Sequence, residues 1–208
     1  MNPEPVIQVD NLWFQLGGRT LFNALSVELR LGVNWIRGPN GIGKTTLLKL
    51  LAGAVQPSSG TARYCNISIA DLSLSQRQQF FYCGDEAPDL PWLTASDFIA
   101  LYQSLYPAMN TDRLHQYLTA FQIGGISRTP ILSLSLGERK KLMLAMAFSL
   151  DVAVVLIDEP FNALDAAARM AVHEWLVTRA AEQRQIIAIT SHLEPQAFNH
   201  VIDLERCD

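Results

Sequence analysis

The amino-acid sequence predicts an α/β fold with a mainly parallel core sheet, an N-terminal antiparallel β-subdomain and an inserted α-helical subdomain. Apolar, strand-sized runs at 152–157 and 185–190 enclose a helical pattern over 165–182, and this alternation is typical of parallel sheets. Residues 6–36 have instead the pattern of successive strands, which indicates an extra antiparallel sheet. The pattern from 87 to 150 is helical, so we expect this stretch to interrupt the core sheet.

Length and composition favour a single domain over residues 1–208. Of these 208 residues, 49% are hydrophobic and 17% are charged, which allows a chain of this length to bury a substantial core. The formal net charge is −4 at pH 7, whereas a nucleic-acid-binding domain needs a basic face. We therefore expect no nucleic-acid partner.

The apolar runs of the sequence are too short for a transmembrane helix. The longest, at 152–157 and 186–189, fall far below the ~20 residues that a spanning helix needs. Residues 1–5 carry neither the basic region nor the apolar region of a secretory signal. The odd number of scattered cysteines favours free thiols in a reducing cytosol. These residues are Cys65, Cys83 and Cys207.

The first quarter of the sequence has the pattern of several strands followed by one helix. Strand patterns cover 6–16, 21–31 and 33–36, and Gly17-Gly18 marks a turn between the first two. A helix is expected over 44–52 because Gly53 stops the pattern.

Shorter signals mark the remaining elements. Two strand-like stretches follow near 61–70 and 79–83, and a last short strand is expected near 201–204. Thr94 with Asp97 forms a capping-box pattern ahead of apolar residues at helical spacing, so we expect a helix to begin there.

A glycine-rich turn between a strand and a helix matches G-x-x-x-x-G-K-[ST] in full. Fewer than about one chain in a hundred of this length matches that pattern by chance. Glycines allow backbone N–H groups to converge on phosphate oxygens, and the helix N-terminus adds partial positive charge. The motif therefore predicts binding of ATP through Gly38, Pro39, Asn40, Gly41, Ile42, Gly43, Lys44, Thr45 and Thr46.

Within this turn, two side chains have specific expected roles. Lys44 supplies a mobile positive charge for the β- and γ-phosphates. Thr45 offers a hydroxyl to Mg²⁺.

Polar residues at the ends of two later strands complete the predicted catalytic site. Asp158 and Glu159 follow the buried run 152–157, and functional groups of parallel sheets gather at such strand ends. We expect Asp158 to hold the magnesium shell and Glu159 to act as general base for a water molecule. His192 follows the next strand, where an imidazole can contact the γ-phosphate.

Together these motifs resemble the nucleotide-binding domain of the ABC ATPases over nearly the whole chain. The run 134–138, Leu-Ser-Leu-Gly-Glu, is similar to the LSGGQ signature of the family, and 162–165 resembles its D-loop. The resemblance implies a nucleotide-binding core with its β-subdomain at 1–86 and 151–208. It places the signature in a helical subdomain at 87–150.

The resemblance also implies a partner for the signature. In the family, Ser135 and Gly137 would cap the γ-phosphate held by the opposite subunit, so ATP would join two ATPase domains. The pair would be a homodimer or would include a second ABC ATPase domain. Arg139, Lys140 and Lys141 follow the signature, and we interpret them as a solvated face.

Three motifs depart from the family pattern. Leu136 and Glu138 stand where Gly and Gln are usual, and the carboxylate adds negative charge near phosphates. The Q-loop has no glutamine, so Asp85 or Glu86 is expected at the metal shell instead. The residue before the turn Gly17-Gly18 is not aromatic, which leaves Phe14 or Trp13 as the expected adenine platform.

The resemblance implies that a separate polytopic membrane subunit receives the work of ATP hydrolysis. The chain would then be cytoplasmic and peripheral on the inner membrane. Trp92 is a candidate contact with the membrane subunit, because Phe98, Tyr102 and Tyr106 recur at four-residue spacing and are interpreted mainly as core residues. In its short length the chain resembles small bacterial exporter ATPases. These are either the haem-exporter ATPases of cytochrome c maturation or the ATPases of drug, peptide or antibiotic exporters. A soluble mechanical ABC ATPase and a low-turnover regulatory subunit are the alternatives.

Overall fold

The computed structural model describes residues 5–84, 90 and 92–206. Its core is a five-stranded sheet in the order β6-β7-β8-β3-β9, and all neighbouring strands are parallel. Strands β7 and β8 are buried at every residue, as strands covered on both faces are. The predicted fold class is confirmed. The strands are β3 (Gly32–Arg37), β6 (Phe80–Cys83), β7 (Val154–Ile157), β8 (Ile186–Thr190) and β9 (His200–Asp203).

A second, antiparallel sheet has the order β2-β1-β4-β5, as the N-terminal pattern predicted. Gly17 and Gly18 join β1 to β2 with φ angles of 58° and 83°, which is the left-handed backbone of a two-residue hairpin turn. The predicted turn is therefore confirmed. The strands are β1 (Ile7–Leu16), β2 (Arg19–Leu29), β4 (Ser59–Tyr64) and β5 (Ile67–Ser68).

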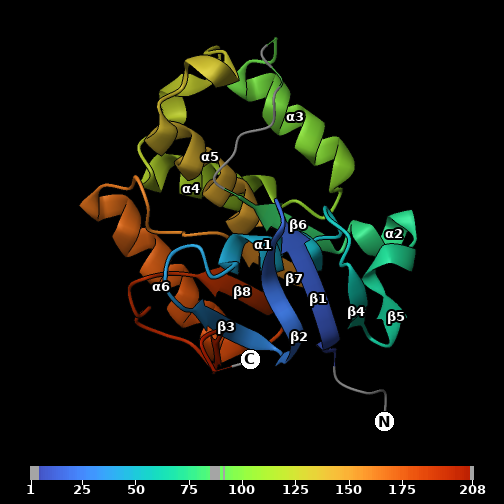
Figure 1. The fold of residues 1–208 in the computed structure, drawn as a ribbon. Helices are drawn as coiled ribbons and strands as arrows, with labels where there is room; N and C mark the ends of the chain where they lie inside the picture. The colour runs from blue at the N-terminus through green and yellow to red at the C-terminus, as the bar shows by residue number, and fades with distance from the viewer. Residues whose placement is uncertain (1–4, 85–89, 91, 207–208) are drawn as a thin grey trace.

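Helix α1 (Lys44–Leu51) lies between the two sheets, as Figure 1 shows. Its leucines are fully buried among side chains from β1, β2, β7 and β8, so one apolar cluster joins the two sheets. Because these leucines anchor the helix in the cluster, the turn that precedes α1 is positioned at the edge of the core sheet.

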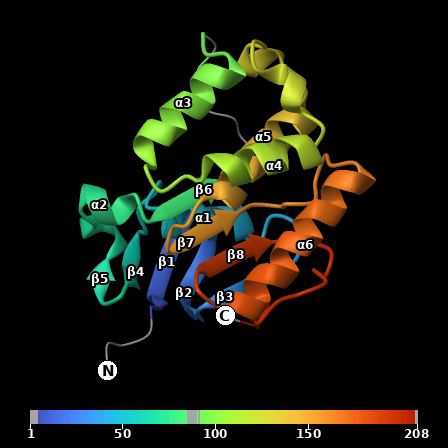
Figure 2. The same cartoon turned by 180° about the vertical axis from the view of Figure 1, so that it is seen from behind.

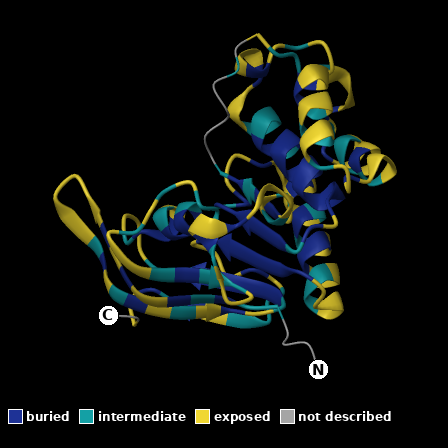
Figure 3. Cartoon of the chain, turned by 90° about the vertical axis from the view of Figure 1, so that its right-hand side faces the viewer, coloured by how far each residue is buried: buried dark blue, intermediate teal, exposed yellow. Residues whose placement is uncertain are grey.

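Helices α3 (Ala95–Leu105), α4 (Thr111–Ala120) and α5 (Leu136–Ser149) lie together over one end of the core sheet (Figures 1 and 2). Helix α3 begins with the predicted capping box, since Thr94 accepts from Asp97 N–H and Asp97 accepts from Thr94 N–H. The inner turns of α5 are buried, whereas the outer faces of this group are exposed (Figure 3).

The long helix α6 (Ala166–Glu182) runs along the face of the core sheet opposite α1 (Figure 2). A short helix, α2 (Leu74–Arg77), precedes β6. Three 3₁₀ turns complete the regular structure, at Ile69–Asp71, Gly124–Ile126 and Ile131–Ser133. No helix within the described ranges has the length and hydropathy needed to cross a membrane.

Candidate functional site

The glycine-rich turn connects β3 to α1, and Gly43 is the residue that caps the helix. Its φ angle of 115° is rare for any residue with a side chain. A Cβ at this position would also lie 2.7 Å from the ring of Phe22. The backbone can therefore approach the β1–β2 sheet only because glycine occupies this position.

Lys44 is the first residue of α1, and its side chain is only 7% exposed. Its Nζ donates to the carbonyl oxygens of Gly38 at 2.7 Å and Pro39 at 3.3 Å, and it lies 4.0 Å from the Glu159 carboxylate. Burial lowers the pKa of Lys44, whereas the negative charges of Glu159 and Asp158 oppose that shift. The turn thus folds around a largely desolvated ammonium group.

Asp158 follows β7 and is 2% exposed. Its Oδ1 accepts a hydrogen bond of 2.6 Å from the hydroxyl of Thr190, the last residue of the neighbouring strand β8. The same hydroxyl oxygen accepts from the backbone N–H of Glu159 at 2.8 Å. Because β7 and β8 are adjacent and parallel, their ends meet at one edge of the sheet, as the sequence predicted.

Glu159 has a left-handed backbone, with φ of 45°, which is uncommon outside glycine. Its Oε1 lies 3.2 Å from Nε2 of His192, the residue that follows β8 by two positions. Burial raises the pKa of Glu159, and the nearby His192 and Lys44 counteract that rise. A carboxylate with a raised pKa is suited to accept a proton near neutral pH.

Lys44, Glu159 and His192 border one cavity of about 470 Å³, a size typical of small-molecule sites, whereas the buried Asp158 does not line it. The structure brings together eight predicted residues there and adds a group from the β1–β2 hairpin and the segment after Glu159. The predicted residues are Asn40, Gly41, Gly43, Lys44, Thr45, Thr46, Glu159 and His192, and the added ones are Leu16, Arg19, Leu21 and Asn162.

The other residues of the turn lie beside this cavity. Gly38 and Pro39 border a neighbouring hollow that His192 shares, and Ile42 is partly buried, where it packs against the apolar cluster. Gly38 and Pro39 meet the ammonium of Lys44 through their carbonyl oxygens.

The oxygen donors at the site fit Mg²⁺ rather than a metal that proteins enclose fully. Thr45 is exposed at the start of α1, and Asp158 has one carboxylate oxygen in a hydrogen bond to Thr190. Within the described ranges no three His, Cys, Asp or Glu side chains form a metal-binding group. Magnesium commonly takes one or two protein oxygens and completes its shell with phosphates and water, so this donor set suits it.

Ser135 and Gly137 stand at the N-terminus of α5, and neither borders the cavity of Lys44 in the same chain. Ser135 is the N-cap, and it forms a capping box with Glu138, whose Oε2 accepts from the hydroxyl of Ser135 at 2.7 Å. This hydrogen bond lowers the pKa of Glu138. A Cβ on Gly137 would lie 2.7 Å from the carbonyl oxygen of Ala163, so glycine permits a close approach.

The structure corrects the prediction for Phe14. Alternation along β1 turns Phe14 inward, where it is buried in the apolar cluster, and it does not border the cavity. Trp13 points to the opposite face of the same strand. Leu16, Arg19 and Leu21 line this end of the cavity instead. The predicted metal ligands Asp85 and Glu86 lie outside the described residues.

Two polar residues of the site went unrecognised in the sequence. Thr190 ends a buried strand, and a hydroxyl at that point was a signal for a contact with Asp158 one strand away. Lys140 was interpreted as part of a solvated face, and this was wrong because its side chain is 5% exposed. Helix α5 is buried on most sides, so its hydrophobic pattern is irregular and did not indicate that Lys140 is buried.

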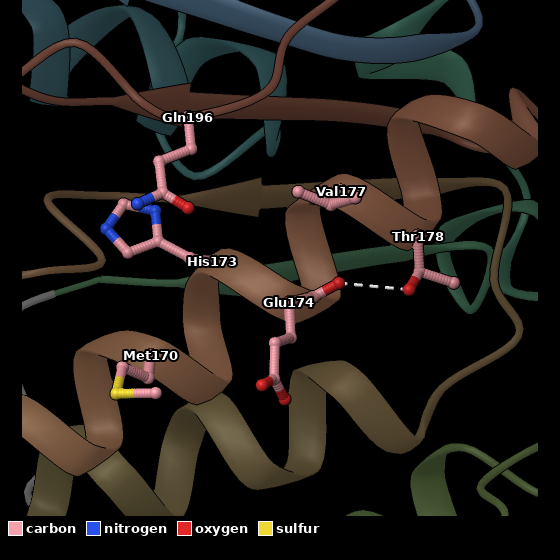
Figure 4. Close-up of a pocket in the computed structure, with 6 residues that line it drawn as sticks. All are labelled: Met170, His173, Glu174, Val177, Thr178 and Gln196. Atoms are coloured by element: carbon pink, nitrogen blue, oxygen red, sulfur yellow. Dashed lines mark hydrogen bonds between the residues drawn. The ribbon is translucent and has the colours of Figure 1, made fainter.

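A second hollow, of about 420 Å³, lies on the outer face of α6 and is shown in Figure 4. The hydroxyl of Thr178 donates to the carbonyl oxygen of Glu174 one turn earlier, and burial lowers the pKa of His173. None of the predicted site residues borders this hollow. Its lining is Met170, His173, Glu174, Val177, Thr178 and Gln196.

Comparisons with known proteins agree with this geometry. A family model described as ABC transporter matches residues 22–162. The chain is 33% identical over 190 residues to the cytochrome c biogenesis ATP-binding export protein CcmA of Haemophilus influenzae, which covers 90% of this chain and 89% of that protein. It is 34% identical over 202 residues to the protein of the same name from Mannheimia succiniciproducens, over 95% and 93% of the two chains.

Importers are also similar. The taurine import ATP-binding protein TauB of Yersinia pestis is 30% identical over 93% of this chain and 76% of its own. A solved ATP-binding subunit of an ABC transporter has the same fold, with a TM-score of 0.79 at 24% identity over 90% of this chain and 80% of its own. The chain therefore belongs to the ABC transporter family and is an ATP-hydrolysing, ATP-binding subunit of that family.

Proposed function

We propose that the cavity at Lys44 binds ATP with Mg²⁺ and that Glu159 is the general base for its hydrolysis. The observation that carries this assignment is the convergence of an ammonium, a carboxylate and an imidazole on one cavity beside a glycine-rich helix N-terminus. Backbone N–H groups of residues 40–46 and the Lys44 charge stabilise the triphosphate. Thr45 and Asp158 would hold Mg²⁺, which would supply positive charge to the phosphates.

The groups around Glu159 favour transfer of a proton from the attacking water to its carboxylate. The Glu159 carboxylate accepts a proton from the attacking water, and its raised pKa makes that transfer more favourable than for an exposed glutamate. His192 Nε2 lies 3.2 Å from Oε1, the buried oxygen of this carboxylate, and so restricts where the side chain can move. Lys44 moves from its contacts with Gly38 and Pro39 to the phosphates, a short displacement within the same turn.

The test separates binding from chemistry. Glu159→Gln is expected to slow ATP hydrolysis by roughly 10²–10⁴-fold while binding of a fluorescent ATP analogue persists. Lys44→Ala is expected to weaken that binding by about 10–100-fold, as loss of a charged hydrogen bond implies. Glu174→Gln, the same change on the exposed face of α6, is the control and keeps both. Turnover by Glu159→Gln at the wild-type rate would falsify the general-base assignment.

We further propose that two ATPase domains close around ATP, with Ser135 and Gly137 of one contacting the γ-phosphate held by the other. The N-terminus of α5 favours anions and lies on a separate element from Lys44, so a second domain is needed to bring the two sites together. A solved ABC transporter cassette with the same fold, at a TM-score of 0.77, is described as dimeric.

The proposed receiver of this motion is a polytopic membrane subunit, with the chain peripheral on the cytoplasmic face of the inner membrane. Trp92 is 73% exposed, whereas Phe98 is buried and Tyr102 and Tyr106 stack against the core, so Trp92 is the available contact. We propose export as the direction, on the similarity to the export proteins named above. Co-purification with a multi-span protein in detergent supports this reading, and a fully soluble assembly favours the mechanical ATPase.

A low-turnover regulatory subunit is the second candidate, and the capping box at Ser135 favours it. The hydroxyl that would meet a phosphate already donates to the Glu138 carboxylate. Steady-state phosphate release from the purified complex distinguishes the two. If Glu138 restrains the site, Glu138→Gln raises turnover several-fold, because a glutamine retains the capping box and removes the charge. Unchanged turnover in this variant removes the support for the regulatory reading.

A further inference from the structure

The peptide unit between Asp158 and Glu159 is held at both ends by side chains from different elements. Its carbonyl oxygen accepts a hydrogen bond of 2.5 Å from Nζ of Lys140, on α5. Its N–H donates to the hydroxyl of Thr190, at the end of β8, at 2.8 Å. The orientation of this peptide plane determines where the Glu159 side chain leaves the backbone.

The backbone at Glu159 requires such support. A non-glycine residue with φ of 45° is held in a sparsely populated conformation, and it persists only when its surroundings fix it. Lys140 is itself an unusual residue for this place, since its side chain is 5% exposed and buried ammonium groups are rare without partners. The contact with the Asp158 carbonyl thus joins two features that each carry a cost in stability.

The same helix meets the segment after Glu159 at two further points. Lys141 donates to the Asp165 carboxylate at 2.5 Å, and Gly137 lies so close to the Ala163 carbonyl that a Cβ would reach within 2.7 Å of it. Ser135 caps the N-terminus of α5, five positions before Lys140, so the signature end of the helix and the general base are connected through one rigid element.

We propose that Lys140 is a positioning residue, which holds the Asp158–Glu159 peptide so that Glu159 faces the attacking water. This inference rests on the proposed role of Glu159. Through Lys140, a displacement of α5 when its N-terminus meets the second domain's nucleotide shifts the general base of its own chain. The α5 contact at one site therefore sets the turnover at the other.

The decisive measurement is the separation of kcat from ATP binding in Lys140→Met. This variant keeps the apolar stem and removes the donor, so kcat falls at least tenfold while the Kd for a fluorescent ATP analogue stays within threefold. Lys140→Arg retains a cationic donor and recovers kcat to within about threefold of wild type. Arg139→Met removes the neighbouring cation of α5, for which the described part of the chain shows no bond to 158–165, and it serves as the control.

A double-mutant cycle distinguishes positioning from general support of the fold. If Lys140 acts through Glu159, adding Lys140→Met to Glu159→Gln changes the residual rate by less than twofold, because the group it orients is already gone. A structural role instead lowers the residual rate by the same factor in both backgrounds. Should Lys140→Met not fold, as judged by circular dichroism, Lys140→Gln takes its place in the cycle.

Besides an equal loss in both backgrounds of the cycle, three results overturn the proposal. These are wild-type kcat in Lys140→Met, a parallel loss of ATP binding and kcat, and equal losses in Lys140→Met and Lys140→Arg. The proposed function fails separately, when the wild-type chain itself binds no ATP or when Glu159→Gln hydrolyses ATP as fast as wild type.

Discussion

Lys44 and Glu159 are ionisable groups, and the cost of burying their charges is only partly offset by their partners. Desolvation lowers the pKa of Lys44 and raises the pKa of Glu159, so each charged form is less stable in the fold than in water. The two groups lie 4.0 Å apart and partly neutralise each other. A bound triphosphate would give Lys44 stronger anionic partners and leave Glu159 free for the water.

The raised pKa of Glu159 predicts an acidic limb in the pH dependence of hydrolysis. Glu159 acts as a base only when ionised, so kcat falls as the pH is lowered through its raised pKa, and the limb lies above the usual range of a glutamate. A pH series of phosphate release measures this. The limb is retained in Glu174→Gln and absent from the residual rate of Glu159→Gln. A limb that is unchanged in Glu159→Gln would assign it to another group.

The same shift predicts that Glu159→Gln stabilises the fold at neutral pH. Because the pKa of Glu159 is higher in the folded than in the unfolded chain, ionisation lowers the free energy of unfolding as pH rises through the folded pKa. Removing the charge eliminates that loss, with an expected rise in Tm of about 1–4 °C at pH 7.5. At pH 4 the difference shrinks, since the glutamate is then largely protonated in both states. Equal thermal midpoints at both pH values contradict this reading.

At the scale of elements, the sequence predicted the strands and helices whose hydrophobic pattern directly reflects their burial. Strands β7 and β8 are uninterrupted apolar runs, and α1 follows an unmistakable glycine-rich turn, so all three were found nearly to the residue. Strand β1 was found too, but alternation alone does not say which face is inward, and Phe14 was therefore placed wrongly. The short helix α2 was missed because four residues hold too little periodicity, although Ser73 and Gln76 form a capping box.

The contacts between elements were the least predictable part of the site. Thr190 and Lys140 reach the Asp158–Glu159 peptide from segments 31 and 18 positions away in sequence. Local patterns carry no information on such pairings, which depend on strand order and on the packing of α5. Arg19 and Leu21 reach the cavity for the same reason, through the register of the β1–β2 hairpin.

The junction of the turn with α1 predicts that Gly43→Ala destabilises the protein. The substitution meets two obstacles, a φ of 115° and a Cβ 2.7 Å from the Phe22 ring. Backbone strain alone is worth about 1–3 kcal/mol, so thermal unfolding should shift down by several degrees and ATP binding should weaken with it. Gly125→Ala, in a 3₁₀ turn where an added Cβ meets nothing within 4 Å, is the matched control. A Gly43→Ala chain with wild-type Tm and affinity would contradict the geometry.

At the scale of the whole molecule, the two ends of the proposed reaction lie on different elements. The phosphate turn and Glu159 belong to the core sheet, whereas Ser135 starts α5 in the group of helices above it (Figure 1). Ser135 does not border the cavity at Lys44 of its own chain, so in the proposed dimer each molecule would supply one part of each site. ATP would complete both sites when two molecules meet, because each triphosphate then contacts a helix N-terminus from the second molecule.

This arrangement predicts an ATP-dependent dimer whose stability depends on the charge at position 135. In the Glu159→Gln background, ATP with Mg²⁺ should shift the chain from monomer to dimer in analytical ultracentrifugation, and removal of Mg²⁺ by EDTA should reverse the shift. Ser135→Asp and Ser135→Asn both provide good N-caps for α5, so both preserve the helix start. Only the aspartate places a negative charge against the second molecule's γ-phosphate, and we expect it to weaken dimerisation at least tenfold while asparagine retains it. Equal dimerisation of the two variants would show that α5 does not contact the nucleotide across the interface, whatever holds the two molecules together.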